Sequence, residues 1–285
     1  MMNVFDSFVK KHEYLVCVDS DGCAMDTMNC KHIHCFGPCM VKEWGLEQWS
    51  EAILARWNEI NLFQMTRGIN RFKGLAKALG EISEQYTAIP GVEALKYWVA
   101  NAPALSNDAV KRAAEAANDL EAKECFEKAL AWSEAVNASI NLLPEEIKIP
   151  FMGAKEGLAA AKQFADVAIV SSANRDAVEE EWEKHNLLEH VDILLAQDCG
   201  SKAHCISEML KFGYTPDKVL MVGDAPGDCD AAEKNGVWYY PILVNHEHES
   251  WVELRENGLH RLREMTFGGE YQQAKKKVFL ENLGG

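Results

Sequence analysis

The stretch YLVCVDSDG, residues Tyr14 to Gly22, decides the fold of this chain. Its apolar part, Tyr14 to Val18, is unbroken, which is typical of a strand covered on both faces in a parallel sheet. The run stops at Asp19, and Asp21 follows with one residue between the two carboxylates. In an open α/β sheet, ligands bind beyond the carboxyl ends of the strands. The stretch therefore predicts a buried strand that delivers two acids to a ligand site.

Further along the chain, apolar runs alternate with segments of helical periodicity. The runs are Val167 to Val170, Val191 to Ala196, Val219 to Val222 and Val237 to Val244. Pro241 interrupts the last run, so we expect that strand at an edge of the sheet. The helical segments are 174–185, 202–212 and 227–235. This alternation predicts right-handed crossovers and a doubly wound α/β sheet.

Residues 25–148 differ from the rest, because they contain no convincing strand. Apolar residues recur there at helical spacing, as in Trp49, Ile53, Trp57 and Ile60. Ser106 is a predicted helix start, and the stretch after Leu143 returns to the sheet through two prolines. We therefore expect an α/β domain of residues 1–24 and 149–285, with a helical tail from about residue 246, and an inserted all-helical domain of residues 25–148.

The composition narrows the classes of partner. The 285 residues are 48% apolar and carry a formal net charge of −15. Such a surface repels nucleic-acid phosphates and anionic lipids, so we expect neither as a partner. The nine cysteines form no Cys-x-x-Cys pair, and no apolar run approaches the roughly 20 residues that span a bilayer. Without a signal peptide either, the sequence favours a cytoplasmic protein with reduced thiols.

The two acids after the first strand need a compensating charge. Like charges at Asp19 and Asp21 either raise a pKa or bind a cation. Mg²⁺ suits them, because it binds oxygen ligands and keeps water and substrate phosphate in its shell. Gly22 then lets the chain turn away from the strand. An acidic turn with no ligand is the alternative that this motif alone leaves open.

Polar side chains also follow the later strands. Ser171 and Ser172 come after the second run, Lys202 after the third, and Asp224 and Asp228 after the fourth. A hydroxyl, free N–H groups and an ammonium can bind a phosphoryl group, and carboxylates can bind a metal. Taken singly, each has an ordinary alternative: a helix cap, a surface lysine or a solvated acid. Together at one sheet edge they supply the parts that phosphoryl transfer needs.

Across residues 14–24 and about 150–245 the chain resembles the haloacid-dehalogenase-like hydrolases. The four signature motifs of that superfamily appear in order as Asp19-Ser20-Asp21-Gly22, Ser171, Lys202 and the loop from Gly223 to Asp228. The resemblance implies a Rossmann-like core with an inserted helical cap domain. It also implies that Asp19 attacks phosphorus, Asp21 is the acid and base, Ser171 and Lys202 bind the phosphoryl oxygens, and Asp19, the carbonyl of Asp21, Asp224 and Asp228 hold Mg²⁺.

The expected function is that of a Mg²⁺-dependent phosphohydrolase acting on a small phosphorylated metabolite through an aspartyl-phosphate. Asp21 favours phosphate-ester chemistry over dehalogenation, since members that cleave carbon–halogen bonds lack this acid. A phosphomutase would use the same residues, and its difference is the group that attacks the aspartyl-phosphate. Two further alternatives remain at this stage: a receiver-like phospho-acceptor without turnover, and a binding protein on the same fold.

The inserted helical segment carries one group of candidate substrate-binding residues. Arg67 and Arg71 are four positions apart and flank Asn70, so they are expected to share a helix face. Two arginines there could hold a substrate carboxylate or a second phosphate. The alternative is an ion-paired surface face. The nearby run Cys30 to Cys39 lacks the paired ligand spacing of a zinc site.

Overall fold

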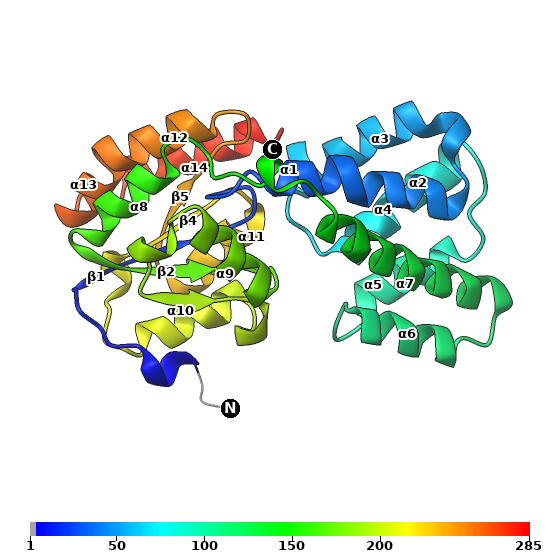
Figure 1. Cartoon of the computed structure of the whole chain (residues 1–285), viewed down its shortest axis with the longest axis horizontal. Helices are drawn as coiled ribbons and strands as arrows, with labels where there is room; N and C mark the ends of the chain where they lie inside the picture. The colour runs from blue at the N-terminus through cyan, green and yellow to red at the C-terminus, as the bar shows by residue number, and fades with distance from the viewer. Residues whose placement is uncertain (1–3) are drawn as a thin grey trace. The chain divides into compact units, whose positions relative to one another are not determined.

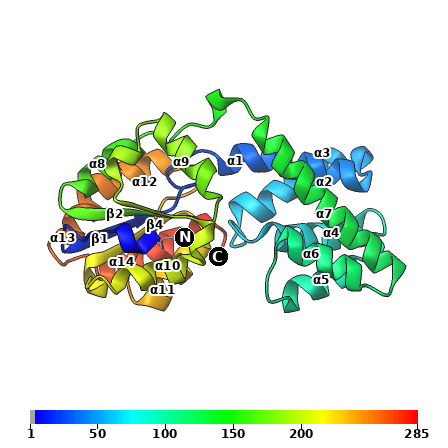
Figure 2. The same cartoon turned by 60° about the horizontal axis from the view of Figure 1, so that its bottom comes forward.

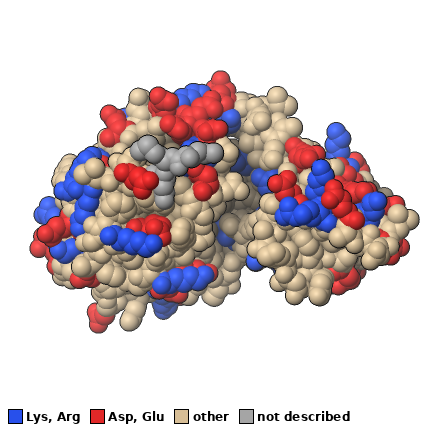
Figure 3. Space-filling view, turned by 90° about the horizontal axis from the view of Figure 1, so that it is seen from below, with Lys and Arg blue, Asp and Glu red and all other residues tan. Residues whose placement is uncertain are grey.

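The computed structural model describes residues 4–285 and divides into two compact units. The core unit consists of Met1–Met28 and Glu145–Gly285, and the helical unit consists of Asn29–Pro144 (Figure 1). Among the described residues, no helix combines the length and apolar character that a membrane span requires. On the face seen in Figure 3, Lys and Arg side chains are interspersed with Asp and Glu.

The core unit contains a five-stranded sheet in the order β3-β2-β1-β4-β5, and every neighbouring pair is parallel. The strands are β1 Tyr14–Val18, β2 Ala165–Val170, β3 Ile193–Leu195, β4 Val219–Gly223 and β5 Trp238–Pro241. Val16 of β1 is paired with Val167 on one side and with Leu220 on the other. The predicted doubly wound α/β sheet is confirmed, and the strand that ends at Pro241 lies at an edge, as expected.

Helices cover both faces of this sheet (Figure 2). They are α8 Ala154–Lys162, α9 Arg175–Lys184, α10 Lys202–Leu210, α11 Pro226–Asn235, α12 Glu247–Glu253, α13 Leu259–Arg263 and α14 Glu270–Asn282. Alternate residues of β1 enter different apolar clusters: Val16 and Val18 pack with α8, α9, α12 and α13, whereas Leu15 and Cys17 pack with α10, α11 and α14. Period-two alternation with both faces apolar explains why the sequence reads as a continuous apolar run.

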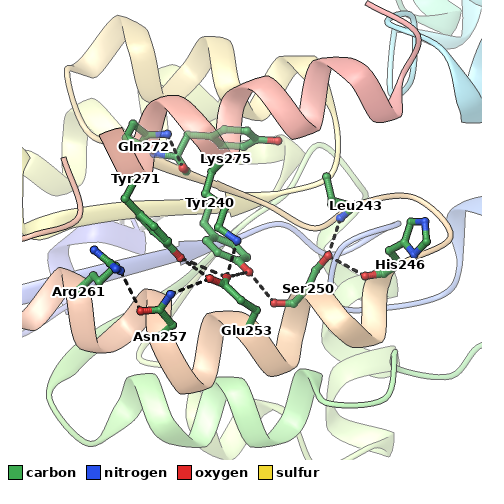
Figure 4. A network of polar contacts seen from close by, with 11 residues as sticks. Tyr240, Leu243, His246, Ser250, Glu253, Asn257, Arg261, Tyr271, Gln272 and Lys275 are labelled. Atoms are coloured by element: carbon green, nitrogen blue, oxygen red, sulfur yellow. Dashed lines mark hydrogen bonds and ion pairs between the residues drawn. The ribbon is translucent and has the colours of Figure 1, made fainter. Parts of the chain in front are cut away.

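The C-terminal tail packs on the sheet through Trp251, which is buried among apolar residues of β1, β2 and β4. Polar contacts of α12 also hold the C-terminal tail against the sheet (Figure 4). The Glu253 carboxylate accepts hydrogen bonds from the hydroxyls of Tyr240 and Tyr271 and pairs with the Lys275 ammonium at 2.8 Å. Because these partners come from β5 and α14, Glu253 ties α12 to a strand and to the last helix.

The helical unit contains helices and no strand over residues 29–144. Its longer helices are α2 Gly37–Trp44, α3 Ser50–Asn58, α4 Arg71–Gln85, α5 Val92–Asn101, α6 Asn107–Ala116 and α7 Leu120–Asn141, and shorter turns include α1 Met28–Lys31 and the π-helical segments His32–Phe36 and Glu59–Phe63. Aromatic side chains fill its core; the rings of Trp57 and Trp132 lie 6.0 Å apart in an edge-to-face arrangement. Ser106 caps α6 by accepting a hydrogen bond from the Ala109 N–H.

One prediction for this unit is wrong: Arg67 and Arg71 do not share a helix face. Arg67 lies in a turn, whereas Arg71 is the first residue of α4. Gly68 has φ 70°, a left-handed conformation that ends any helix there. Asn70 then caps α4, since its side chain accepts a hydrogen bond from the Phe72 N–H. Because α4 begins only after the Asn70 cap, Arg67 lies outside the helix, and the four-residue spacing does not place it on the same face as Arg71.

Candidate active site

The polar residues predicted from the sequence gather beyond the carboxyl ends of the strands. Asp19 directly follows β1, Ser171 follows β2, and Asp224 follows β4. Lys202 begins α10, the helix that comes after β3. The Asp19 N–H donates to the carbonyl of Val222 at 3.0 Å, which carries the pairing of β1 and β4 one residue past the strand. The strand order therefore places the first and fourth motifs on adjacent strands.

Three carboxylates form a buried cluster at this edge. Asp19, Asp224 and Asp228 each offer an oxygen, and these oxygens all lie within 4.8 Å of one another. Their exposed fractions are 4%, 1% and 0%. Burial raises the pKa of Asp19 well above its usual range, and the negative charges of Asp228 and Asp224 raise it further, while Lys202 opposes the shift. Water cannot screen these groups, so the cluster needs positive charge from within the site.

Lys202 supplies part of that charge. Its Nζ lies 2.8 Å from Oδ2 of Asp19 and 2.6 Å from Oδ1 of Asp228. Burial alone would lower the pKa of Lys202, but the two carboxylates outweigh burial and raise it. The ammonium is therefore charged over the whole physiological pH range. It holds the side chains of Asp19 and Asp228 in fixed positions.

Gly223 makes room for Asp228. A Cβ at residue 223 would lie 2.3 Å from Cγ of Asp228, which is too close for any side chain. The other carboxylate oxygen of Asp228 accepts a hydrogen bond from the Ala225 N–H at 3.0 Å. The sequence left two roles open for Asp228, and the structure shows both. Asp228 accepts a hydrogen bond at the start of α11, and it also faces Lys202 and the other two acids.

The residues present fit a hard divalent cation. The oxygens of three buried carboxylates lie close together, and the Lys202 ammonium pairs with two of them. Carboxylate oxygens are the ligands that a hard cation prefers, and Mg²⁺ at such sites takes carboxylates together with water and substrate phosphate. Asp21 does not contribute its carboxylate to this cluster.

Asp21 lies in the tight loop that follows β1. The carbonyl of Ser20 accepts hydrogen bonds from the N–H groups of three residues, Cys23, Ala24 and Met25. Gly22 has φ 85°, so it provides the turn that the sequence predicted. The carboxylate of Asp21 is half-buried and accepts a hydrogen bond from the Thr27 hydroxyl. Thr27 was missed as a site residue, because a contact six residues along a loop leaves no periodic signal.

The two serines after β2 differ from each other. Ser171 is buried, and its Oγ accepts a hydrogen bond from the Ala173 N–H at 3.1 Å. Ser172 is exposed. Asn174, rather than Ser172, caps α9 through hydrogen bonds from the N–H groups of Asp176 and Ala177. The buried Ser171 hydroxyl at the strand end is the donor that the sequence indicated, whereas the Asn174 cap is the ordinary alternative and occupies the N–H groups of Asp176 and Ala177.

Arg71 of the helical unit is held by neutral groups. Its Nη1 donates to the carbonyl and the hydroxyl of Ser133 and to Oδ1 of Asn137, at 3.3, 3.0 and 2.8 Å. Its guanidinium lies 5.1 Å from the ring centre of Phe36. Burial lowers the pKa of Arg71. Arg67, which is fully buried, donates from Nη1 to the carbonyl of Leu62.

The sequence profile of the haloacid dehalogenase-like hydrolases matches residues 96–240, just over half of the chain. The chain belongs to the haloacid dehalogenase-like hydrolases. The resemblance inferred from the motifs is confirmed, and general hydrolase chemistry follows from it. For this haloacid dehalogenase-like hydrolase, the matched part contains Ser171, Lys202 and both acids of the fourth motif, whereas Asp19 and Asp21 precede it.

Solved structures with a similar fold include a protein of Lactobacillus delbrueckii subsp. bulgaricus assigned as a phosphoglycolate phosphatase. That match has a TM-score of 0.52 at 15% identity and covers 91% of this chain and 100% of the other. A protein of Thermotoga maritima assigned as a beta-phosphoglucomutase matches with a TM-score of 0.46 at 14% identity, covering 80% of this chain and 84% of its own. No curated protein sequence matches this chain. At such identities the likeness concerns the fold alone.

Proposed function

We propose that this hydrolase is a Mg²⁺-dependent phosphatase that cleaves a phosphate ester of a small metabolite. The observation that carries the proposal is the buried cluster of Asp19, Asp224 and Asp228 with Lys202 between two of its members. Such a cluster is costly to bury unless it serves a cation and an anion. Phosphoryl transfer uses both, since a metal ion and a lysine neutralise the phosphoryl oxygens.

In the first step, a carboxylate oxygen of Asp19 attacks phosphorus in line with the ester oxygen. The bond between phosphorus and the ester oxygen breaks, and Asp21 gives that oxygen its proton. The product of this step is an aspartyl-phosphate on Asp19 together with the free alcohol. Asp19 is well placed to attack because Lys202 fixes its carboxylate at 2.8 Å and β4 fixes its backbone.

In the second step, the aspartyl-phosphate is hydrolysed. Asp21, now a carboxylate, takes a proton from a water molecule, and the water oxygen attacks phosphorus. The bond between phosphorus and Asp19 breaks, which regenerates the free carboxylate and releases inorganic phosphate. The Thr27 hydroxyl, which donates to the Asp21 carboxylate, stabilises the ionised form that this step needs.

The other residues bind and neutralise. The carboxylates of Asp19, Asp224 and Asp228 and the carbonyl of Asp21 would hold Mg²⁺. When bound, the metal supplies positive charge for the phosphoryl oxygens and lowers the repulsion between phosphate and carboxylates. The Ser171 hydroxyl, the backbone at Ser172 and the Lys202 ammonium bind the phosphoryl oxygens beside it.

The helical unit serves as the cap that selects the substrate, on this proposal, with Arg67, Asn70 and Arg71 as candidate contacts. Arg71 supports the idea best, because its hydrogen-bond partners Ser133 and Asn137 are neutral and leave its positive charge available to an anion. A substrate with a carboxylate or second phosphate would match it.

The test is release of inorganic phosphate from phosphorylated sugars, nucleotides and organic acids, with Mg²⁺ and with EDTA. Wild type is compared with Asp19→Asn and with Asp230→Asn, the same change at an exposed acid of α11. We expect metal-dependent turnover that Asp19→Asn loses and Asp230→Asn keeps. A rearranged phosphate ester without phosphate release would indicate a mutase, and a stable aspartyl-phosphate would indicate a phospho-acceptor. Turnover in Asp19→Asn at the wild-type rate would refute the mechanism.

A further inference from the structure

We propose that two buried tryptophans, Trp182 of α9 and Trp251 of α12, are positioning residues for the loop that carries Asp19 and Asp21. The proposal rests on the proposed phosphatase function and adds two residues to it. Neither tryptophan belongs to a motif of the site. Each acts through its indole N–H, which donates a hydrogen bond to the loop.

Trp182 holds the residue between the two aspartates. Its Nε1 donates to Oγ of Ser20 at 2.9 Å, and both side chains are fully buried. The carbonyl of Ser20 also accepts the N–H groups that close the loop. Ser20 is therefore fixed at its side chain and at its backbone. Because Asp19 and Asp21 are its chain neighbours, the direction of both carboxylates depends on how Ser20 is held.

Trp251 holds the loop one turn further on. Its Nε1 donates to the carbonyl of Cys23 at 2.9 Å, and its ring is buried. Space for the ring comes from Gly157 of α8, where a Cβ would lie 2.5 Å from Cε3 of Trp251. The indole thus fills a space that α8 leaves open with a glycine, and its N–H donates to the backbone of the loop.

The C-terminal tail gains a role from this contact. Trp251 lies on α12, and two residues later Glu253 binds Tyr240, Tyr271 and Lys275 (Figure 4). The network fixes α12 against β5 and α14. The tail therefore belongs to the machinery that sets the geometry of the Asp19 loop, and it is more than a cover for the sheet.

The expected size of the effect follows from the precision that catalysis needs. A single buried hydrogen bond contributes about 1 kcal/mol to stability, which a domain of this size can lose. A misplacement of about 1 Å at reacting groups can cost about 100-fold in rate. Loss of one indole N–H, with the ring kept, should therefore reduce kcat by about tenfold while the fold persists.

The experiment compares Trp182→Phe and Trp251→Phe with Trp132→Phe. Trp132 is a matched control, because its buried indole Nε1 donates to the carbonyl of Phe36 at 3.1 Å in the core of the helical unit. We expect kcat to fall about tenfold in the first two variants, with KM changed less than about twofold. Trp132→Phe should lower Tm by about as much as Trp182→Phe and Trp251→Phe do, but it should leave kcat at the wild-type value.

A double-mutant cycle tests the route through Ser20. If Trp182 acts through that hydroxyl, the losses of kcat in Ser20→Ala and Trp182→Phe should not be additive. The double variant should have the kcat of the less active single variant. Gly157→Ala keeps the indole N–H but displaces the ring that carries it, so it should lower kcat as Trp251→Phe does. Unchanged kcat in both tryptophan variants, an equal loss in Trp132→Phe, or full additivity in the cycle would overturn the proposal.

A measurement on wild type separates failure of this proposal from failure of the phosphatase function. The indole N–H signals of Trp182, Trp251 and Trp132 are followed by NMR in isotope-labelled protein as Mg²⁺ alone is added. We expect the first two signals to shift and the Trp132 signal to stay. Shifts without phosphatase activity would reject the proposed function and keep the positioning role. Absence of shifts in an active enzyme would reject the positioning role.

Discussion

Lys202 of the core unit and the half-buried Arg71 of the helical unit are compensated in different ways. Lys202 of the core unit pairs with Asp19 and Asp228, which raise its pKa against the effect of burial. Arg71 of the helical unit has neutral hydrogen-bond partners, and burial lowers its pKa. The difference teaches that the charge of Lys202 is part of an internal balance, whereas that of Arg71 remains available to an anion from outside.

The largest expected effect is on the balanced cation. Lys202→Met leaves the buried carboxylates of Asp19 and Asp228 without their ammonium, so we expect the free energy of unfolding to fall by about 3–5 kcal/mol. Differential scanning calorimetry should show Tm lower by about 10 °C, and added Mg²⁺ should restore part of the loss. Lys218→Met, which breaks the surface pair with Glu13, should change the free energy by less than about 1 kcal/mol. Equal losses of unfolding free energy in both variants would mean that Lys202 does not offset repulsion between the buried carboxylates.

A second change disturbs the same balance through geometry. Gly223→Ala brings a Cβ to 2.3 Å from Cγ of Asp228, so the carboxylate that pairs with Lys202 must shift. We expect phosphatase activity to fall about 100-fold and the Mg²⁺ concentration for half-maximal activity to rise. The control is Gly227→Ala, where no atom lies within 4 Å of the added Cβ. If Gly223→Ala kept wild-type kinetics, Asp228 would have no part in the site.

The cation of the helical unit is tested with the best substrate from the panel. Arg71→Leu removes its positive charge, and we expect KM to rise about tenfold with kcat for a generic aryl phosphate unchanged. Arg112→Leu is the control, since Arg112 is exposed on a helix of the same unit. A KM that stays at the wild-type value with every doubly anionic substrate would make Arg71 a structural residue of α4.

The smallest expected effect concerns a charge outside both sites. Burial raises the pKa of Glu253, but hydrogen bonds from Lys275, Tyr240 and Tyr271 outweigh it and lower the pKa below its usual value. A lowered pKa contributes stability above the unfolded pKa, and the contribution is lost as pH falls through the folded pKa. At pH 7, Glu253→Gln should therefore lower Tm by about 2–4 °C. The difference should begin to shrink as pH falls through the unfolded glutamate pKa of about 4.3, and it should vanish below the lowered folded pKa, where wild type is protonated too. A difference in Tm that persists there would assign the effect to packing.

The sequence determined the elements and the edge where chemistry gathers. Uninterrupted apolar runs predicted the strands, and parallel strands place the residues after their carboxyl ends at one edge of the sheet. Asp19, Ser171 and Asp224 could therefore be found from their positions alone. The capping role of Ser106 was equally local, because a cap needs only a hydroxyl and the next few N–H groups.

Tertiary structure decided what depends on distant partners. The order β3-β2-β1-β4-β5 puts Asp19 beside Val222, and no pattern in the chain fixes that order. The indoles of Trp182 and Trp251 reach Ser20 and Cys23 across most of the chain, and a tryptophan on an apolar helix face indicates only a core residue. Periodicity reports which face of an element is buried. It does not report which donor meets which acceptor, because that depends on how separately formed elements pack.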